Sequence, residues 1–254
     1  MKKTILKITL AFLSVILLTS CSKKDNKDPS VQTSVTLDSK SVSLHYDESH
    51  QFSLLGSGNI TTSSYNWISS DVAVGIIDAT GKFTAKKIGT ATIKAVKGND
   101  SFEAQVTVLP YSTICKEPFW NFNDDIAATK AKESRTLVGQ SSTVLMYSGE
   151  NGKIRNIEYM YGDNSKMSSA AILFDGSTAV IEEAAKFFKE RYAYVGEESD
   201  VYFYSDNKNV AIGITIDKTL GFIAIYIPYT SNGNTNSLNL KTISGILKTA
   251  KKIQ

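Results

Sequence analysis

The chain has few of the residues on which most catalytic and metal sites depend. Its 254 residues include two cysteines, Cys21 and Cys115, and two histidines, His45 and His50. A nucleophilic thiol needs a neighbouring base such as histidine, and both histidines lie far from Cys115 in the sequence. A metal ion needs three or four converging ligands, which the polar turn between His45 and His50 does not supply. We therefore expect no catalytic residues, no metal site and no cofactor.

The chain also lacks an excess of charge once its first residues are set aside. Of the 28 basic residues, Lys2, Lys3 and Lys7 lie at the N-terminus, which leaves 25 against 25 acidic residues. Binding to nucleic acid depends on a basic surface that neutralises phosphates. The balanced charge of the remaining chain predicts that nucleic acid is not a partner.

One long apolar run stands at the N-terminus. ITLAFLSVILL (Ile8–Leu18) follows the three lysines and is shorter than the roughly 20 residues that a membrane-spanning helix needs. This arrangement is typical of a signal peptide, which we place at residues 1–20. The run ends in Leu18-Thr19-Ser20-Cys21, which resembles a bacterial lipobox.

The lipobox resemblance implies that Cys21 becomes the first mature residue and carries lipid, with acyl chains such as palmitate, so that the membrane is a partner. Two or more chains anchor a protein stably, whereas one chain is marginal. The alternative is an ordinary secretory signal in which Cys21 is incidental. With Cys21 lipidated, Cys115 has no partner within the chain, and no disulfide is expected.

Residues 21–33 form a polar, charged stretch that we interpret as a flexible tether. Ser22 stands where an aspartate would favour retention in the inner membrane, so the resemblance implies an outer-membrane lipoprotein. Charged tethers of this kind resemble those of Bacteroidetes lipoproteins, some of which reach the cell surface. Whether the protein faces the surface or the periplasm stays open at this point.

Residues 34–110 consist of short runs rich in β-branched and aromatic residues, separated by turn residues. The alternation is clearest in Thr90–Val96, where Ala91, Ile93 and Ala95 share one face. Short alternating runs at this spacing predict an antiparallel β-sandwich.

The segment YNWISSDVAVGIIDATGKFTAKKIGTATIKA (Tyr65–Ala95) resembles the group 2 bacterial Ig-like domain. The matching residues are Trp67, Ser69, Ser70, Asp71, Val72, Ala73, Asp78, Gly81, Gly89, Thr90, Ala91, Thr92 and Ile93. The resemblance implies an all-β Ig-like sandwich with Trp67 between its sheets and a tight turn at Asp78–Gly81. Gly75-Ile76 departs from the pattern, and we expect a β-bulge there. Family members occur in adhesins and as spacers in surface proteins, which implies a stalk or an adhesive module.

The remaining residues, 111–254, contain an internal repeat. VGQSSTVLMYS (Val138–Ser148) returns as VGEESDVYFYS (Val195–Ser205), and six of the eleven positions are identical. At the same offset, ten of the twenty-five positions of Asp124–Ser148 are identical to those of Ile181–Ser205. Because the match extends into predicted helices, we interpret it as a structural unit used twice and not as a ligand motif.

The unit is expected to be a helix and three strands, at about residues 119–176 and 177–230. Apolar residues at helical spacing predict helices at Phe119–Glu133, capped by Asn121 or Asn123, at Ala179–Tyr192, capped by Ser177 or Thr178, and at Leu238–Ile253. Glu190 is expected on the solvated side of its helix. The predicted strands are Thr143–Ser148, Ile154–Tyr161, Ser169–Phe174, Val201–Ser205, Val210–Asp217 and Gly221–Tyr229. The simplest assembly is an α+β domain in which helices pack on one face of an antiparallel sheet of about six strands.

One face of this sheet is the candidate binding site. Isoleucines and a valine alternate along Val210–Ile216 and along Ile223–Ile227, and we expect both sets to meet the helices. The aromatic residues that would then face away are Tyr202, Tyr204, Tyr226, Phe222, Tyr159 and Tyr161. An aromatic face without helix cover is a platform for a glycan or a protein ligand. The alternative is that the face packs against the Ig-like domain or a loop.

These patterns together predict a lipid-anchored, non-enzymatic envelope protein that acts in surface binding or adhesion. The Ig-like domain would be its stalk or adhesive unit and the α+β domain its recognition surface. The alternative is a periplasm-facing structural or accessory subunit of an envelope complex. A remote alternative is a hydrolase that uses acids such as Asp124, Glu182 or Glu197, since a glycosidase needs two facing carboxyls.

Overall fold

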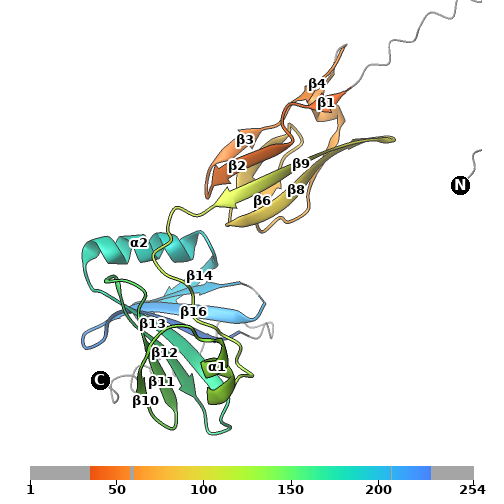
Figure 1. Ribbon diagram of the computed structural model, residues 1–254. Helices are drawn as coiled ribbons and strands as arrows, with labels where there is room; N and C mark the ends of the chain where they lie inside the picture. The colour runs from red at the N-terminus through yellow and green to blue at the C-terminus, as the bar shows by residue number, and fades with distance from the viewer. Residues whose placement is uncertain (1–34, 58–59, 207, 230–254) are drawn as a thin grey trace, which may run out of the picture.

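The computed structural model describes residues 35–57, 60–206 and 208–229. It contains two domains that follow one another along the chain, joined by a linker that begins at Pro110 (Figure 1). The expected signal peptide (1–20), lipidated Cys21, tether (21–33) and helix at Leu238–Ile253 lie outside the described residues. Within the described ranges, no helix combines the length and the apolarity of a membrane-spanning segment.

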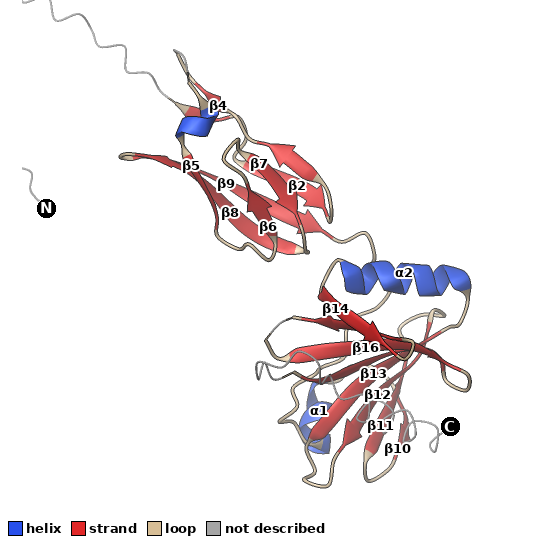
Figure 2. Cartoon of the chain, turned by 180° about the vertical axis from the view of Figure 1, so that it is seen from behind, coloured by secondary structure: helices blue, strands red, loops and turns tan. Residues whose placement is uncertain are grey.

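The first domain is a sandwich of short strands, as the alternation predicts. Its elements are β1 (Thr36–Leu37), β2 (Ser41–His45), β3 (Ser49–Gln51), β4 (Leu54–Leu55), the 3-10 turn η1 (Thr62–Ser64), β5 (Asn66–Ser69), β6 (Gly75–Ile77), β7 (Lys82–Ala85), β8 (Gly89–Lys97) and β9 (Asp100–Leu109). One sheet has the order β2-β9-β8-β5, the second has the order β3-β7-β6, and β1 pairs with β4. Figure 2 shows β2, β9, β8 and β5 of the first sheet and β7 and β6 of the second. β2 runs parallel to β9 and the other pairs are antiparallel.

Aromatic and aliphatic side chains fill the space between the two sheets. Trp67 on β5 is buried, and its ring centroid lies 6.2 Å from that of the buried Phe52. The Trp67 Nε1–H donates to the carbonyl oxygen of Thr62 at 3.1 Å, so the polar edge of the indole is satisfied within an apolar core. On β8, Ala91 and Ile93 are buried and their neighbours are not, which is the alternation expected of a strand with one face on a core.

Two glycines are required by this packing. The N–H of Gly81 donates to the carbonyl of Asp78 at 3.0 Å, and the φ of Gly81 is +84°, a conformation that glycine adopts readily. At Gly75, an added Cβ would lie 2.1 Å from the ring of Phe83. The bulge expected at Gly75-Ile76 is wrong, because β6 pairs with β7 without a register shift. The glycine at this position makes room for Phe83.

The second domain is one antiparallel sheet of eight strands in the order β10-β11-β12-β13-β17-β16-β15-β14. Its elements are α1 (Ile126–Lys132), β10 (Leu137–Gln140), β11 (Val144–Ser148), β12 (Ile154–Tyr161), β13 (Met167–Phe174), α2 (Thr178–Lys189), β14 (Ala193–Glu198), β15 (Val201–Ser205), β16 (Val210–Asp217) and β17 (Gly221–Pro228). Both helices pack on the same face of this sheet (Figure 1). The expected fold class, an Ig-like sandwich followed by an α+β domain with an antiparallel sheet, is confirmed.

The strand order is symmetric about its centre, where β13 pairs with β17. Unit 1 (Ile126–Phe174) comprises α1 and β10 to β13, and unit 2 (Thr178–Pro228) comprises α2 and β14 to β17. The expectation of three strands in each copy is wrong, because the repeated motif itself adds an edge strand to each unit. Both edge strands have a register shift at the same repeat position, just before Gly139 and just before Gly196.

Both helices are shorter than expected. α1 begins after Asp125, whose carboxylate accepts a hydrogen bond from the N–H of Ala128 at 2.8 Å, so the expected caps at Asn121 and Asn123 are wrong. The residues before α1 are not helical and pack on the sheet as an extended segment. α2 begins after Ser177, which is one of the two expected positions, but the Ser177 side chain makes no capping hydrogen bond.

The sheet has two buried faces. The helix face, beneath α1 and α2, includes Tyr147, Ile212 and Tyr226. The opposite face, which we call the far face, is lined by residues that include Met160 and Ile225. Glu158 points to the far face, because it alternates with Tyr159 and precedes Met160 by two positions along β12. Glu158 is fully buried, and among the described residues neither of its carboxylate oxygens has a hydrogen-bond partner.

Candidate functional site

Four of the six aromatic residues expected on an open face lie in the core instead. Each is at most 6% exposed and belongs to the cluster beneath the helices; they are Tyr159, Tyr161, Phe222 and Tyr226. The expectation that these four form an open platform is therefore wrong.

The error lies in the register of one hairpin. β16 and β17 are joined by the three residues Lys218–Leu220, and this connection pairs Ile212 with Tyr226 and Ile216 with Phe222. Directly paired residues point to the same face of a sheet. The aromatic residues of β17 therefore lie beside the isoleucines of β16 on the helix face, and Ile223–Ile227 contributes its isoleucines to the far face.

The other two residues, Tyr202 and Tyr204, also lie on the helix face, so the expectation that they face away from the helices is wrong. They line an open groove there, which we call the α2 groove. It lies between α2 and strands β15 and β16 and has a volume of about 570 Å³. Such a volume is within the range of about 300–1,000 Å³ found for ligand sites. The lining residues include Ile181 and Ala185 from α2, and Tyr202, Tyr204, Ile214, Ile216 and Phe222 from the strands. The structure thus brings three of the six predicted site residues together.

Large apolar side chains are exposed at this groove. Ile216 is 66% exposed, Tyr202 is 49% exposed, and Tyr194 on the neighbouring edge strand is 54% exposed. The rings of Tyr194 and Tyr204 meet edge to face with centroids 5.6 Å apart. An aromatic and aliphatic patch that extends from an edge strand into a groove is typical of an interaction site.

The charge at the groove is negative. Asp200 lines it, and Glu197 pairs directly across from Tyr202, so both acids lie at the same end of the strands. Burial and then the charge of Glu197 raise the pKa of Tyr194. Asp200 is held in place because its carbonyl oxygen accepts a hydrogen bond from the Thr215 hydroxyl at 3.0 Å.

At the corresponding sheet position of unit 1, the chain itself covers the helix face. The linker segment that precedes α1 lies on the helix face: the N–H of Phe119 donates to the Tyr159 hydroxyl at 3.2 Å, and the N–H of Met167 donates to the carbonyl of Asp124 at 2.9 Å. Phe119, Trp120 and other apolar residues of this segment pack against the core. We call residues 113–125 the covering segment.

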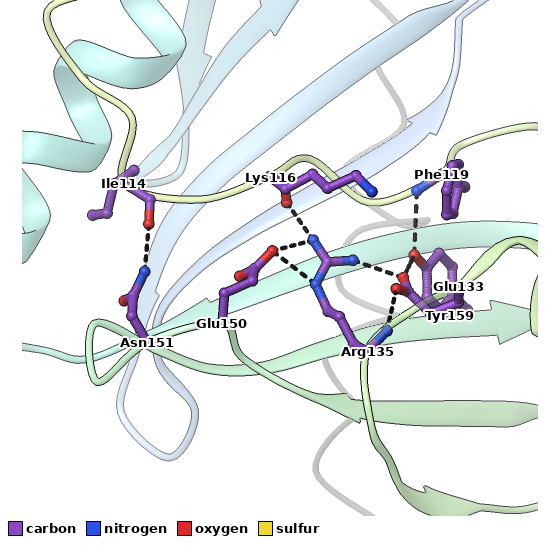
Figure 3. A network of polar contacts seen from close by, with 8 residues as sticks. All are labelled: Ile114, Lys116, Phe119, Glu133, Arg135, Glu150, Asn151 and Tyr159. Atoms are coloured by element: carbon purple, nitrogen blue, oxygen red, sulfur yellow. Dashed lines mark hydrogen bonds and ion pairs between the residues drawn. The ribbon is translucent and has the colours of Figure 1, made fainter.

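A polar network anchors the covering segment to unit 1 (Figure 3). The Arg135 guanidinium bonds to the carboxylates of Glu133 and Glu150 and to the carbonyl of Lys116. The Tyr159 hydroxyl donates to Glu133 at 2.5 Å. Burial raises the pKa of Glu133, but the hydrogen bonds from Tyr159 and Arg135 outweigh it and hold the pKa below its usual value. Each buried charge is thereby paired, which is typical of a structural network.

The covering segment also contacts unit 2, through the carboxylate of Glu117. Glu117 accepts hydrogen bonds from the hydroxyls of Tyr192 at 2.8 Å and Tyr226 at 3.2 Å. Burial raises the pKa of Glu117, and the two tyrosine hydrogen bonds oppose that effect. The sequence gives no signal for this contact, because Glu117 and Tyr226 are 109 residues apart.

The junction between the domains is built around Glu190, which the sequence placed on a solvated helix side. The structure overturns that expectation: Glu190 is 1% exposed, and its carboxylate accepts hydrogen bonds from the N–H groups of Tyr111 at 2.7 Å and Ser112 at 3.1 Å. Its carbonyl accepts a hydrogen bond from the N–H of Ile88 in the Ig-like domain at 2.8 Å. The ring of Tyr111 also stacks on His45 with centroids 4.5 Å apart.

The remaining titratable candidates lie apart from the groove or on its rim. Cys115 is a free thiol whose pKa is raised to about 12, mainly by burial. Asp124 is buried and paired with Lys132 at 2.6 Å, whereas Glu182 and Glu197 are exposed on α2 and β14. Among the described residues, no group of three or more His, Cys, Asp and Glu side chains has the arrangement of a metal site.

Comparison with solved structures finds S-layer proteins with weak overall similarity. Domains 5-6 of the S-layer protein SbsC align with a TM-score of 0.26 and 11% identity, covering 78% of this chain and 85% of that chain. Domains 1-6 of surface layer protein SbsC align with a TM-score of 0.25 and 15% identity, covering 77% of this chain but only 21% of that chain. Scores this low carry no argument about function. No curated protein sequence matches the chain.

Comparison with family models gives one match, to the bacterial Ig-like domain (group 2), over residues 31–108. This range holds Trp67, the Asp78–Gly81 turn and β8, which are the features that carried the resemblance in the sequence. The match supports the coarse expectation of a surface or structural module. The first domain therefore matches the model of the group 2 bacterial Ig-like family, as the resemblance in the sequence implied.

Proposed function

We propose that the protein is a lipid-anchored cell-envelope protein that binds a ligand at the cell surface through its α+β domain, with the Ig-like domain as the stalk. The observation that carries this proposal is the α2 groove, because exposed Tyr202 and Ile216 flank an apolar hollow of about 570 Å³. A hollow lined by aromatic side chains and few polar groups is the usual form of a binding site.

The junction supports the role of a stalk. Glu190 joins α2 to the linker and to the Ig-like domain through three hydrogen bonds, and α2 also forms one wall of the groove. A spacer that meets its binding domain through such contacts holds the binding surface at a fixed orientation. This arrangement suits adhesion, where the ligand lies at a distance from the membrane.

The anchor is proposed on the residues that precede the described part of the chain. Leu18-Thr19-Ser20-Cys21 resembles a lipobox, and two or more acyl chains would hold the protein in the outer membrane. Replacement by Cys21→Ser should abolish incorporation of radiolabelled palmitate and release the protein from the membrane fraction. Labelling that persists in the Cys21→Ser variant would contradict lipidation at this residue.

Exposure on the cell surface is tested separately by protease treatment of intact cells. We expect the α+β domain to be digested while a periplasmic control protein survives. Protection of the chain would overturn the surface assignment and leave the periplasm-facing accessory subunit as the better reading. Binding, and no catalysis, is proposed because the acids considered for hydrolysis lie on separate elements and one of them, Asp124, is paired with Lys132.

A further inference from the structure

We propose that the α2 groove binds an extended peptide segment of a protein partner, one that carries aromatic side chains next to a basic residue. This inference rests on the proposed function, because it names the ligand of the same groove. It follows from comparing the two units of the repeat, one of which holds such a segment already.

Two residue pairs in the sheet wall of the groove correspond to pairs in unit 1. Leu145 pairs with Tyr159 in unit 1, and its repeat counterpart Tyr202 pairs with Ile214 in unit 2. At the far ends of the following hairpins, Tyr161 pairs with Met167 in unit 1, as Ile216 pairs with Phe222 in unit 2. The groove is therefore the unit 2 equivalent of the surface around Tyr159 and Met167.

In unit 1 that surface is fully covered. Leu145 and Tyr159 are 0% exposed and Met167 is 2% exposed. The cover includes the covering segment, which reaches Tyr159 through the N–H of Phe119 and Met167 through the carbonyl of Asp124. The same sheet position thus buries an extended strip of main chain with aromatic side chains in one half of the domain.

In unit 2 the described residues that lead into the helix are too few for an equivalent cover. β13 ends at Phe174 and α2 begins at Thr178, so only three residues, Asp175–Ser177, lead into the helix. Unit 1 is preceded by the whole linker from Pro110. The missing length explains why Tyr202 is 49% exposed and Ile216 is 66% exposed, while their counterparts in unit 1 are buried.

The chemistry of the groove indicates which peptide fits. Its described lining is apolar and aromatic apart from Asp200 and Thr215, and the Thr215 hydroxyl already donates to the Asp200 carbonyl. A sugar needs several converging hydrogen-bonding groups, and an unmatched hydroxyl in such a site is costly. Apolar and aromatic side chains need none.

Charge complementarity predicts that the partner segment carries a basic residue. Asp200 is the only charged residue among the described lining, and Glu197 lies beside Tyr202 on β14. Acidic groups at the rim of an apolar site select a positively charged ligand and speed its association. The covering segment has a basic residue next to an aromatic one, since Lys116 lies 5.5 Å from the centroid of the Phe119 ring; its acidic residue, Glu117, is bound by the hydroxyls of Tyr192 and Tyr226.

The covering segment supplies the probe for a test. A synthetic peptide of residues 113–123 with Cys115→Ser is titrated into the full chain by calorimetry, and we expect saturable binding. Replacing Ile216→Ser or Tyr202→Ala should weaken binding by at least about tenfold, as for the loss of a central contact. Val72→Ser is the matched control, because Val72 is also 66% exposed but lies in the Ig-like domain; it should leave the affinity unchanged.

Variants of the peptide separate the two parts of the proposal. Phe119→Ala with Trp120→Ala in the peptide should abolish binding, and Lys116→Gln should weaken it and reduce its dependence on salt. No saturable binding, or equal binding to the Ile216→Ser and Val72→Ser chains, would overturn the peptide proposal.

Other occupants of the groove give different outcomes. If the chain binds a glycan but not the peptide, and Tyr202→Ala abolishes the glycan binding, the peptide proposal is wrong and the proposed function stands. A concentration-dependent dimer that Ile216→Ser disrupts would identify a second copy as the occupant, and crosslinking from position 202 to residues 230–254 would identify the chain's own C-terminal segment; either result overturns a separate partner. If neither peptide nor glycan binds, the proposed function fails as well.

Discussion

A single substitution at Glu158 tests whether the far face of the sheet is buried. Its carboxylate is fully buried among apolar residues, and within the described part of the chain neither oxygen has a hydrogen-bond partner. Burial raises the pKa of Glu158 from 4.5 to about 7, and the positive charge of Arg155 opposes this only in part. A carboxyl in this position is more stable protonated than ionised.

The size and sign of the effect follow from the two pKa values. Below about pH 4.5 the folded and unfolded chains both hold the proton, whereas between about pH 4.5 and 7 only the folded chain does. The free energy of unfolding therefore falls as the pH rises through this window, and the loss is complete above about pH 7. The difference between 4.5 and about 7 corresponds to about 3 kcal/mol at most.

The substitution Glu158→Gln keeps the shape and removes the ionisation. At pH 4.5 the variant and the wild type should have similar stability, and at pH 8 the variant should be more stable by up to about 3 kcal/mol. Scanning calorimetry at both pH values measures this as a higher melting temperature, by roughly 2–4 °C for each kcal/mol.

Glu182→Gln on the exposed side of α2 is the control, and it should change stability by no more than about 0.5 kcal/mol at either pH. A difference between the Glu158→Gln variant and the wild type that is the same at pH 4.5 and pH 8 would refute the reasoning. In that case the carboxylate is either solvated or matched by a positive charge.

Three further predictions concern other parts of the molecule. Replacing Glu190→Ala strands the N–H groups of Tyr111 and Ser112 and should cost about 1–3 kcal/mol for each, with faster proteolytic cleavage at the linker; unchanged cleavage would contradict a tight junction. Cys115, with a pKa of about 12, should not react with a thiol reagent at pH 8 until the chain is unfolded in urea. Gly81→Ala places a side chain at a φ of +84° and should lower the unfolding free energy of the Ig-like domain by about 1–3 kcal/mol. Gly98→Ala is the control for the backbone penalty alone, because Gly98 has a φ of +59° and no atom lies near an added Cβ, whereas at Gly81 the Cβ would also clash with Trp67.

Elements with a strong burial pattern could be predicted from the sequence. β12, β15 and β16 have the bounds expected from their alternation, because each of these strands places apolar side chains on the buried faces of the sheet. β10 and β14 were missed because they lie at the edges, where Val138 is 55% exposed and Tyr194 is 54% exposed. An edge strand is defined by hydrogen bonds to one neighbour, and its side chains need not alternate in polarity.

The face on which the candidate site residues lie was predicted wrongly for a related reason. Tyr202 and Tyr204 were expected on the face away from the helices but lie on the helix face at the α2 groove. Tyr226 is buried on the same face because of how the β16–β17 hairpin pairs. A change of one residue in the register moves every side chain of a strand to the opposite face. Because β17 has apolar residues on both faces, its sequence pattern does not distinguish the two registers.

The groove itself could not be predicted, because it depends on a length difference between the units. The sequence pattern predicted a helix over Phe119–Glu133. In the structure only Ile126–Lys132 is helical, and the aromatic residues of this range pack as an extended cover. Contacts such as that of Glu117 with Tyr226 join residues distant in the chain, and a local pattern has no access to them.

The paired bulges at Gly139 and Gly196 bear on how copies of this chain behave when crowded together in an envelope. In a sheet with two similar edge strands, an edge strand of one copy can pair with an edge strand of the next copy and so extend the sheet. Because the register slips at the same point in both edge strands, and a bulge twists its strand away from regular pairing, neither edge strand offers a straight row of free amides. The internal repeat thus places the same bulge on both edge strands, and a bulge opposes regular edge-to-edge pairing of copies.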